Sequence, residues 1–63
     1  MKKTELALLY MPYASADVAR RHLNKCIRNR ELLEALEATG WAFWIHWLTP
    51  LQVELIEKYL GEP

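Results

Sequence analysis

The chain has little cysteine and no long hydrophobic run. A single cysteine, Cys26, cannot form a disulfide within the 63 residues, so a reducing cytoplasm is the expected compartment. The longest stretch without a charged side chain, residues 38–53, is interrupted by glycine, histidine and proline and falls short of the about 20 apolar residues that a membrane helix needs. No secretory signal pattern is apparent, because Glu5 follows Lys2 and Lys3 closely. We therefore expect a cytoplasmic protein with no membrane partner.

The chain also lacks a net charge and the length for a large core. Eight basic side chains balance eight acidic ones, which argues against tight nucleic-acid binding, since phosphate affinity depends on an excess of lysine and arginine. Sixty-three residues provide one domain of marginal stability, because a chain of this size buries only about 60% of its unfolded surface. We expect a single domain over residues 1–63.

Capping residues and breakers mark the first two helices. Thr4 can cap a helix over residues 5–11, which Pro12 ends. Ser15 can cap a second helix, with Asp17 in its first turn, where a negative charge suits the helix dipole. The apolar side chains of this second helix recur at helical spacing and predict its buried face: Ala19, Leu23, Cys26 and Ile27.

Two further helices follow. Asn29 can cap a third helix over residues 30–39, and Gly40 stands where a left-handed residue would end it. Thr49 and Gln52 form a capping-box pattern before a fourth helix, with proline at its first position. The predicted inward side chains are Leu32, Leu33 and Leu36 of the third helix, and Val53, Ile56, Tyr59 and Leu60 of the fourth. The fold class is therefore all-α, with three to four short helices.

An aromatic connector, residues 41–48, separates the last two helices and contains all three tryptophans. Its aromatic and β-branched residues favour an extended backbone. In a strand the side chains of Trp41, Phe43, Ile45 and Trp47 would point one way, and those of Ala42, Trp44 and His46 the other. We expect an extended connector or a short hairpin-like turn, and continuation of the third helix stays open as the alternative.

Three stretches of the chain resemble one known family. They are "TELALLYMP" at the start, "SADVARRHL" in the second helix, and "LTPLQVELIEKYLGEP" at the end. Together they are similar to a family of small bacterial proteins classed as a domain of unknown function. The resemblance implies a compact helical domain, loosely like helix-turn-helix domains, and no known activity. It also implies a short, polar and often basic segment after Gly40. The aromatic connector departs from that pattern. A contact surface that evolved in this member, or one that was engineered into it, would explain the difference.

Neither a metal site nor a catalytic site is expected. His22 and Cys26 stand four residues apart with His46 as a third possible ligand, but zinc needs three or four converging ligands. Cys26 and a histidine could nominally act as nucleophile and base. Nothing in the sequence supplies an oxyanion hole, an orienting acid or a glycine-rich phosphate loop. We predict that the protein is not an enzyme and uses no cofactor.

A basic face is the first candidate binding surface. Five residues of the second helix fall on the side opposite its apolar stripe: Arg20, Arg21, Asn24, Lys25 and Arg28. A recognition helix in a DNA major groove has this character, with arginine reading guanine and asparagine reading adenine. The simpler interpretation is a solvated face, paired with the glutamates of the third helix. Nucleic-acid binding is therefore the alternative function.

The aromatic connector is the preferred candidate. Leucines from all four helices already provide much of a core, so the central aromatic residues exceed what 63 residues can bury. Exposed apolar surface marks interaction sites, and tryptophan is enriched among the residues that dominate binding energy. We predict a protein-binding module whose contact residues are Phe43, Trp44, Ile45, His46 and Leu51, with Trp41 and Trp47 in the core. The partner is another protein or a second copy of the chain. A core-only role and a small apolar ligand site stay open.

Overall fold

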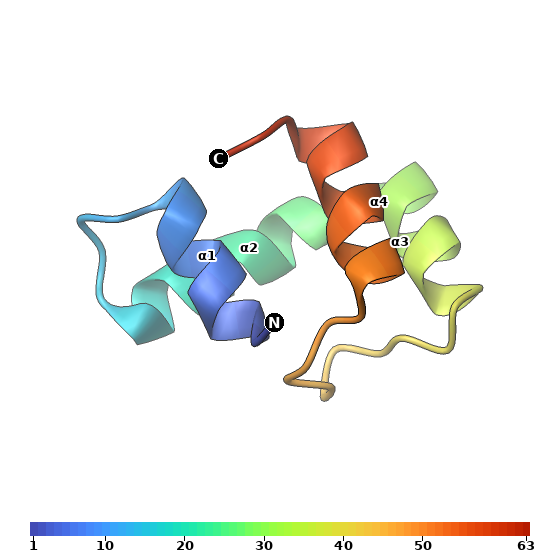
Figure 1. Ribbon diagram of the computed structural model, residues 1–63, viewed down its shortest axis with the longest axis horizontal. Helices are drawn as coiled ribbons and strands as arrows, with labels where there is room; N and C mark the ends of the chain where they lie inside the picture. The colour runs from blue at the N-terminus through green and yellow to red at the C-terminus, as the bar shows by residue number, and fades with distance from the viewer.

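Four helices account for 62% of the chain in the computed structural model, which describes residues 1–63. They are α1 (Lys3–Tyr10), α2 (Ala16–Ile27), α3 (Arg30–Glu37) and α4 (Pro50–Leu60). α1 packs on α2, and α3 packs on α4, so the molecule consists of two helix pairs side by side along its longest dimension of 31 Å (Figure 1). The all-α prediction is confirmed.

Ten side chains from all four helices and the connector form one hydrophobic core. They are Leu6, Ala7, Ala19, Leu23, Ile27, Leu32, Leu36, Trp41, Leu48 and Ile56. The apolar stripe predicted for the second helix is largely correct, although Cys26 is only partly buried. Tyr59 was wrongly placed in the core: it is 39% exposed. Gln52 is buried on α4 instead.

The cap residues of the last three helices are those that the sequence predicts. The Ser15 hydroxyl accepts a hydrogen bond from the Val18 N–H, and the Asn29 side chain accepts bonds from two N–H groups at the start of α3. In α4 the Thr49 hydroxyl accepts from the Gln52 N–H, while the Gln52 side chain accepts from the Thr49 N–H. These bonds satisfy N–H groups that a helix start leaves without a partner.

The start of α1 differs from the prediction. The helix begins at Lys3, and Thr4 lies inside it rather than capping it. Lys2 precedes the helix with an extended backbone (φ −72°, ψ 142°) and pairs with Trp47 of the connector in an antiparallel bridge. This pairing fixes where the chain can turn into the helix, so α1 begins before the residue with the best capping side chain.

Helix α3 ends earlier than predicted, and Gly40 closes its C-terminus. The helix ends at Glu37, and Gly40 has a φ of +88°, a conformation that glycine adopts readily. The Gly40 N–H donates to the Glu37 carbonyl, and the Trp41 N–H donates to the Leu36 carbonyl. These two bonds are those of a Schellman motif. The prediction that Gly40 adopts a left-handed conformation is correct. This conformation directs the chain so that Trp41 returns to the core.

Candidate interaction surface

The connector is extended but turns once and pairs with the N-terminus. The Ile45 N–H donates to the Ala42 carbonyl over 3.0 Å, which makes a turn in the middle of the segment. The Lys3 N–H donates to the His46 carbonyl over 2.7 Å, and the Leu48 N–H donates to the Met1 carbonyl over 2.7 Å. The prediction of an extended connector is therefore correct, and helix α3 does not continue through it.

Lys3 holds the connector from inside the fold. Its side chain is only 1% exposed, and its ammonium group donates to the Phe43 carbonyl over 2.9 Å. The same nitrogen lies 5.7 Å from the centre of the Trp41 ring, within cation–π range. Burial, and then the charge of Arg20, lower the pKa of Lys3 below its usual 10.5. The side-chain ammonium of Lys3 bonds to Phe43 and its backbone N–H bonds to His46, so this one residue fixes both ends of the segment 43–46.

The inner aromatic residues of the connector belong to the fold. Trp41 is 3% exposed, and its ring meets the Phe43 ring edge-on at 4.9 Å. Its indole N–H is buried without a hydrogen-bond partner. Phe43 and Ile45 are half-buried and pack against the core. The prediction that these two side chains are exposed is wrong, because the turn at 42–45 directs them inward.

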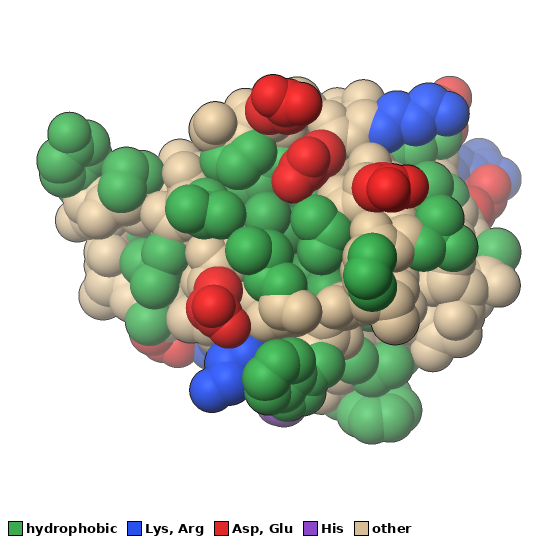
Figure 2. Space-filling model, in the orientation of Figure 1, with side chains coloured by type: hydrophobic (Ala, Val, Ile, Leu, Met, Phe, Trp, Pro, Cys, Tyr) green, Lys and Arg blue, Asp and Glu red, His purple; other side chains and the backbone are tan.

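The outer apolar residues are exposed. Trp44 is 77% exposed, Trp47 61% and Leu51 54%, and His46 is exposed between the tryptophans. Trp47 was predicted to be in the core; Leu48 takes that buried position instead, while Trp47 pairs with Lys2. We call Trp44, Trp47 and Leu51 the aromatic edge. Figure 2 shows bulky hydrophobic side chains along the lower edge of the molecule, where the connector runs in Figure 1.

Cations adjoin the connector on the side of the first helix pair. The Lys2 ammonium lies 5.5 Å from the centre of the Trp47 ring. The Arg28 guanidinium lies 4.7 Å from the centre of the half-buried Phe43 ring, on which it stacks from α2. Both distances are within the range of cation–π attraction.

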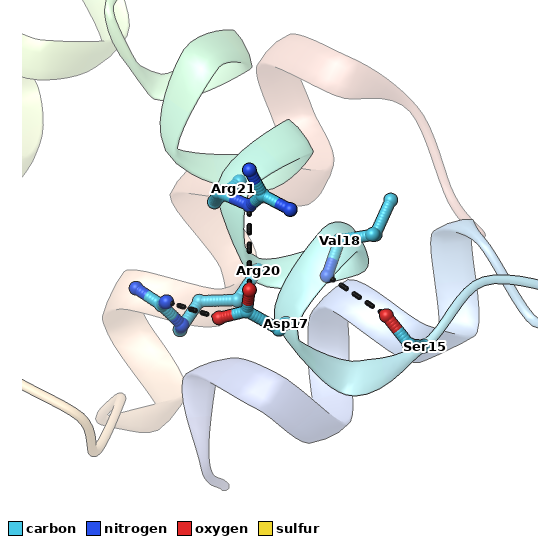
Figure 3. A network of polar contacts seen from close by, with 5 residues as sticks. All are labelled: Ser15, Asp17, Val18, Arg20 and Arg21. Atoms are coloured by element: carbon cyan, nitrogen blue, oxygen red, sulfur yellow. Dashed lines mark hydrogen bonds and ion pairs between the residues drawn. The ribbon is translucent and has the colours of Figure 1, made fainter.

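The basic face of α2 is partly occupied by contacts within the molecule. Arg20 and Arg21 both pair with Asp17, over 2.6 and 3.5 Å, and converge on its carboxylate in Figure 3. The hydrogen bond from Arg20 and the charge of Arg21 lower the pKa of Asp17. Asn24 has a buried Oδ1 without a partner. The five predicted residues thus lie together along α2. The acid that pairs with Arg20 and Arg21 is Asp17 of the same helix, whereas the prediction placed the pairing acids on the third helix.

Among α3 glutamates only Glu34 pairs with an arginine, Arg30 of its own helix, over 3.2 Å. Lys25 is exposed and makes no ion pair. In contrast to Arg28, it makes no cation–π interaction with an aromatic ring. It is the member of the basic face that is most available to a ligand.

No pocket is present, and no three side chains of histidine, cysteine, aspartate or glutamate gather where they could bind a metal ion. None of the helices has the length and apolar character required to cross a bilayer.

Sequence reasoning missed the buried lysine. Lys3, Leu6 and Ala7 are the buried residues of α1 and stand at positions i, i+3 and i+4, so they share one helix face. That spacing is the signal that could have identified Lys3 as an inward side chain. No local signal indicates that residues 1–3 pair with residues 46–48, because the pairing joins segments more than 40 positions apart.

The chain belongs to the family described as Domain of unknown function (DUF4248), whose model matches residues 1–63. No curated protein and no solved structure matches it.

Proposed function

We propose that this member of a family without an assigned activity is a non-enzymatic protein-binding module. Its contact residues would be those of the aromatic edge, Trp44, Trp47 and Leu51, with His46 as a hydrogen-bonding residue beside them. The observation that carries the proposal is the exposure of Trp44: its side chain is 77% exposed although Trp41 and nine other residues already complete the core. A bacterial source, a cytoplasmic location and an engineered origin of the connector stay predictions.

The energy available from such residues is large. A tryptophan that moves from water into an interface removes about 200 Å² of surface, which corresponds to about 5 kcal/mol at about 25 cal/mol per Å². The cost of ordering the segment is small here, because Lys3 bonds to the carbonyls of Phe43 and His46 on either side of Trp44. A contact residue that is already held in place loses little conformational freedom on binding.

Phe43 and Ile45 take a supporting role in this proposal. Both are half-buried and pack against the core, and they lie on either side of Trp44 in the sequence. Their packing directs the Trp44 side chain outward. Truncating them would therefore disturb binding indirectly, through the fold, whereas truncating Trp44 would disturb it directly.

Variants at two exposed aromatic residues test the proposal. Tyr13 is fully exposed in the α1–α2 loop, away from the aromatic edge, so Tyr13→Ala is the matched control for Trp44→Ala. Proteins captured from an extract of the source organism are identified with the wild type, and their affinities for the three purified chains are then measured by calorimetry. We expect Trp44→Ala to weaken binding about 30-fold, as a loss of about 2 kcal/mol implies. Equal binding by all three chains would refute the proposal.

Nucleic-acid binding through α2 is the second candidate. The observation in its favour is the free, exposed side chain of Lys25 beside Arg21 and Arg28 on a helix with one acidic residue. Retention on a duplex DNA column at low salt, reduced by Lys25→Ala and by added salt, is the expected result. Absence of retention at low salt would exclude it.

A further inference from the structure

The charges of this neutral chain are divided between its two helix pairs. Residues 1–28, the cationic half, hold six of the eight lysines and arginines and two of the eight acidic residues. Residues 29–63, the anionic half, hold the other two basic residues and six acidic ones. The cationic half thus has an excess of four positive charges, and the anionic half has an excess of four negative charges.

The two excesses lie at opposite ends of the molecule. The helix pairs are arranged along the longest dimension, 31 Å, with α1 and α2 toward one end and α3 and α4 toward the other (Figure 1). Acidic side chains gather over α4 in Figure 2. All three ion pairs join residues of the same half, Asp17 with Arg20 and Arg21, and Arg30 with Glu34. No ion pair within the molecule therefore neutralises one half with the other.

The aromatic edge lies between the two halves. The connector joins α3 to α4 in the anionic half, yet it is bonded to residues 1–3 of the cationic half. Two cations adjoin it, Lys2 at the Trp47 ring and Arg28 at the Phe43 ring. On the other side, Glu54 is exposed on α4 three residues after Leu51, so the two side chains share a helix face. An apolar centre is thus flanked by positive charge on one side and negative charge on the other.

We infer that the partner of the aromatic edge is a second copy of this chain, in an antiparallel dimer with two-fold symmetry. The inference rests on the proposed function and specifies its partner. A two-fold axis at the aromatic edge brings the same apolar residues of both copies together. When this axis is perpendicular to the long dimension of the molecule, it also places the cationic half of each copy against the anionic half of the other, so that both flanks are electrostatically complementary.

The size of the chain suits such an arrangement. A stable interface buries about 800 Å² per partner, which is under a fifth of the 4296 Å² of surface here. The core consists of ten buried residues, and domains of this size commonly gain stability by association. Burial of the aromatic edge would cover its two exposed tryptophans.

The mass in solution is the first test. Sedimentation of the purified chain over a range of concentrations is expected to give a species of twice 7.4 kDa. The dissociation constant of this dimer should rise roughly tenfold as the salt concentration rises from about 0.05 to about 0.5 M, because salt screens the flanking charges. A monomer at millimolar concentration would overturn the inference. Masses that grow beyond the dimer would also overturn it, since they indicate open head-to-tail association.

Charge exchange is the sharper test. One variant carries Lys2→Glu and Arg28→Glu, and the other carries Glu54→Lys; all three residues are exposed. Each variant alone repels its own copy at both flanks and should associate at least tenfold more weakly than the wild type. Mixed together, one chain is acidic at both flanks and the other basic, so a one-to-one heterodimer should form. Failure of the mixture to associate, with both variants folded by circular dichroism, would contradict the antiparallel arrangement.

Single aromatic variants connect this test to the proposed function. Trp44→Ala should weaken the dimer by more than about 30-fold, because both copies lose the side chain, and Tyr13→Ala should leave the dimer unchanged. If the wild type is a monomer but captures a different protein through Trp44, the dimer is refuted and the binding function stands. If Trp44→Ala alters neither self-association nor capture, both are refuted.

Discussion

Trp41 and Trp44 stand three residues apart and should differ sharply in their contribution to stability. Trp41 is 3% exposed, packs edge-on against Phe43 at 4.9 Å and lies over the Lys3 ammonium. Truncation of a core tryptophan to alanine costs about 3–5 kcal/mol. Trp44 is 77% exposed, and substitutions at such surface positions stay within about 0.5 kcal/mol.

The loss at Trp41 is large relative to the whole stability of the chain. Sixty-three residues correspond to about 3–9 kcal/mol of unfolding free energy in total, so Trp41→Ala should be largely unfolded near room temperature. Trp41→Phe should lose much less. It keeps a ring in the core and removes the buried indole N–H that has no partner, and leaving such a group unpaired costs about 1–3 kcal/mol.

Urea unfolding followed by far-ultraviolet circular dichroism measures these differences. The helical signal is suitable because 62% of the chain is helical, and it does not depend on the tryptophan being replaced. The wild type, both Trp41 variants and Trp44→Ala are compared at one low protein concentration, so that association does not contribute. Equal losses for Trp41→Ala and Trp44→Ala would refute the reasoning, because they would mean that Trp44 is buried within the monomer.

Three further outcomes are expected. Gly40→Ala should lose about 1–2 kcal/mol in thermal unfolding, since a side chain at φ +88° is strained although no neighbour obstructs it; an unchanged midpoint would contradict this. Burial lowers the pKa of Lys3, so between that lowered value and 10.5 the unfolded chain binds more protons than the folded chain. The wild type should therefore gain stability relative to Lys3→Met as the pH rises toward 10.5; a constant difference would exclude the effect. The pKa of Asp17 is held below its usual 3.8, so its contribution is complete above that value and is lost as the pH falls through the lowered pKa. Asp17→Asn should therefore lose less stability on acidification than the wild type, and equal losses would show that the pairing is not kept in solution.

The parts of the fold that short-range chemistry controls could be predicted from the sequence. Ser15, Asn29 and Thr49 cap helices because their side chains reach N–H groups two or three residues ahead. Gly40 ends α3 because the turn there requires positive φ. Each of these signals lies within a few residues of the structure that it produces, so no knowledge of the tertiary fold is needed to interpret it.

The candidate site was predicted only in part, because its geometry depends on contacts between distant segments. The sequence correctly indicated that Trp44 and Leu51 are exposed and Trp41 is buried. It misplaced Phe43 and Ile45, which were thought to exceed the volume of the core, and Trp47, which was placed in the core because it stands beside a helix end. The actual path includes a turn at residues 42–45 and a bridge between Lys2 and Trp47, and neither has a local sequence signal.

The pairing of the N-terminus with the connector explains why exposed tryptophans are compatible with so small a core. Met1 and Lys3 bond to the backbone on either side of Trp47, and the Lys3 ammonium bonds to the carbonyl just before Trp44. The connector is therefore held by backbone contacts and by Trp41 beneath it, and the outer tryptophans are not needed for its position. Side chains that the fold does not require can face a partner at little cost in stability. If Trp44 is replaced, the contact surface is expected to change while the segment that carries it stays in place.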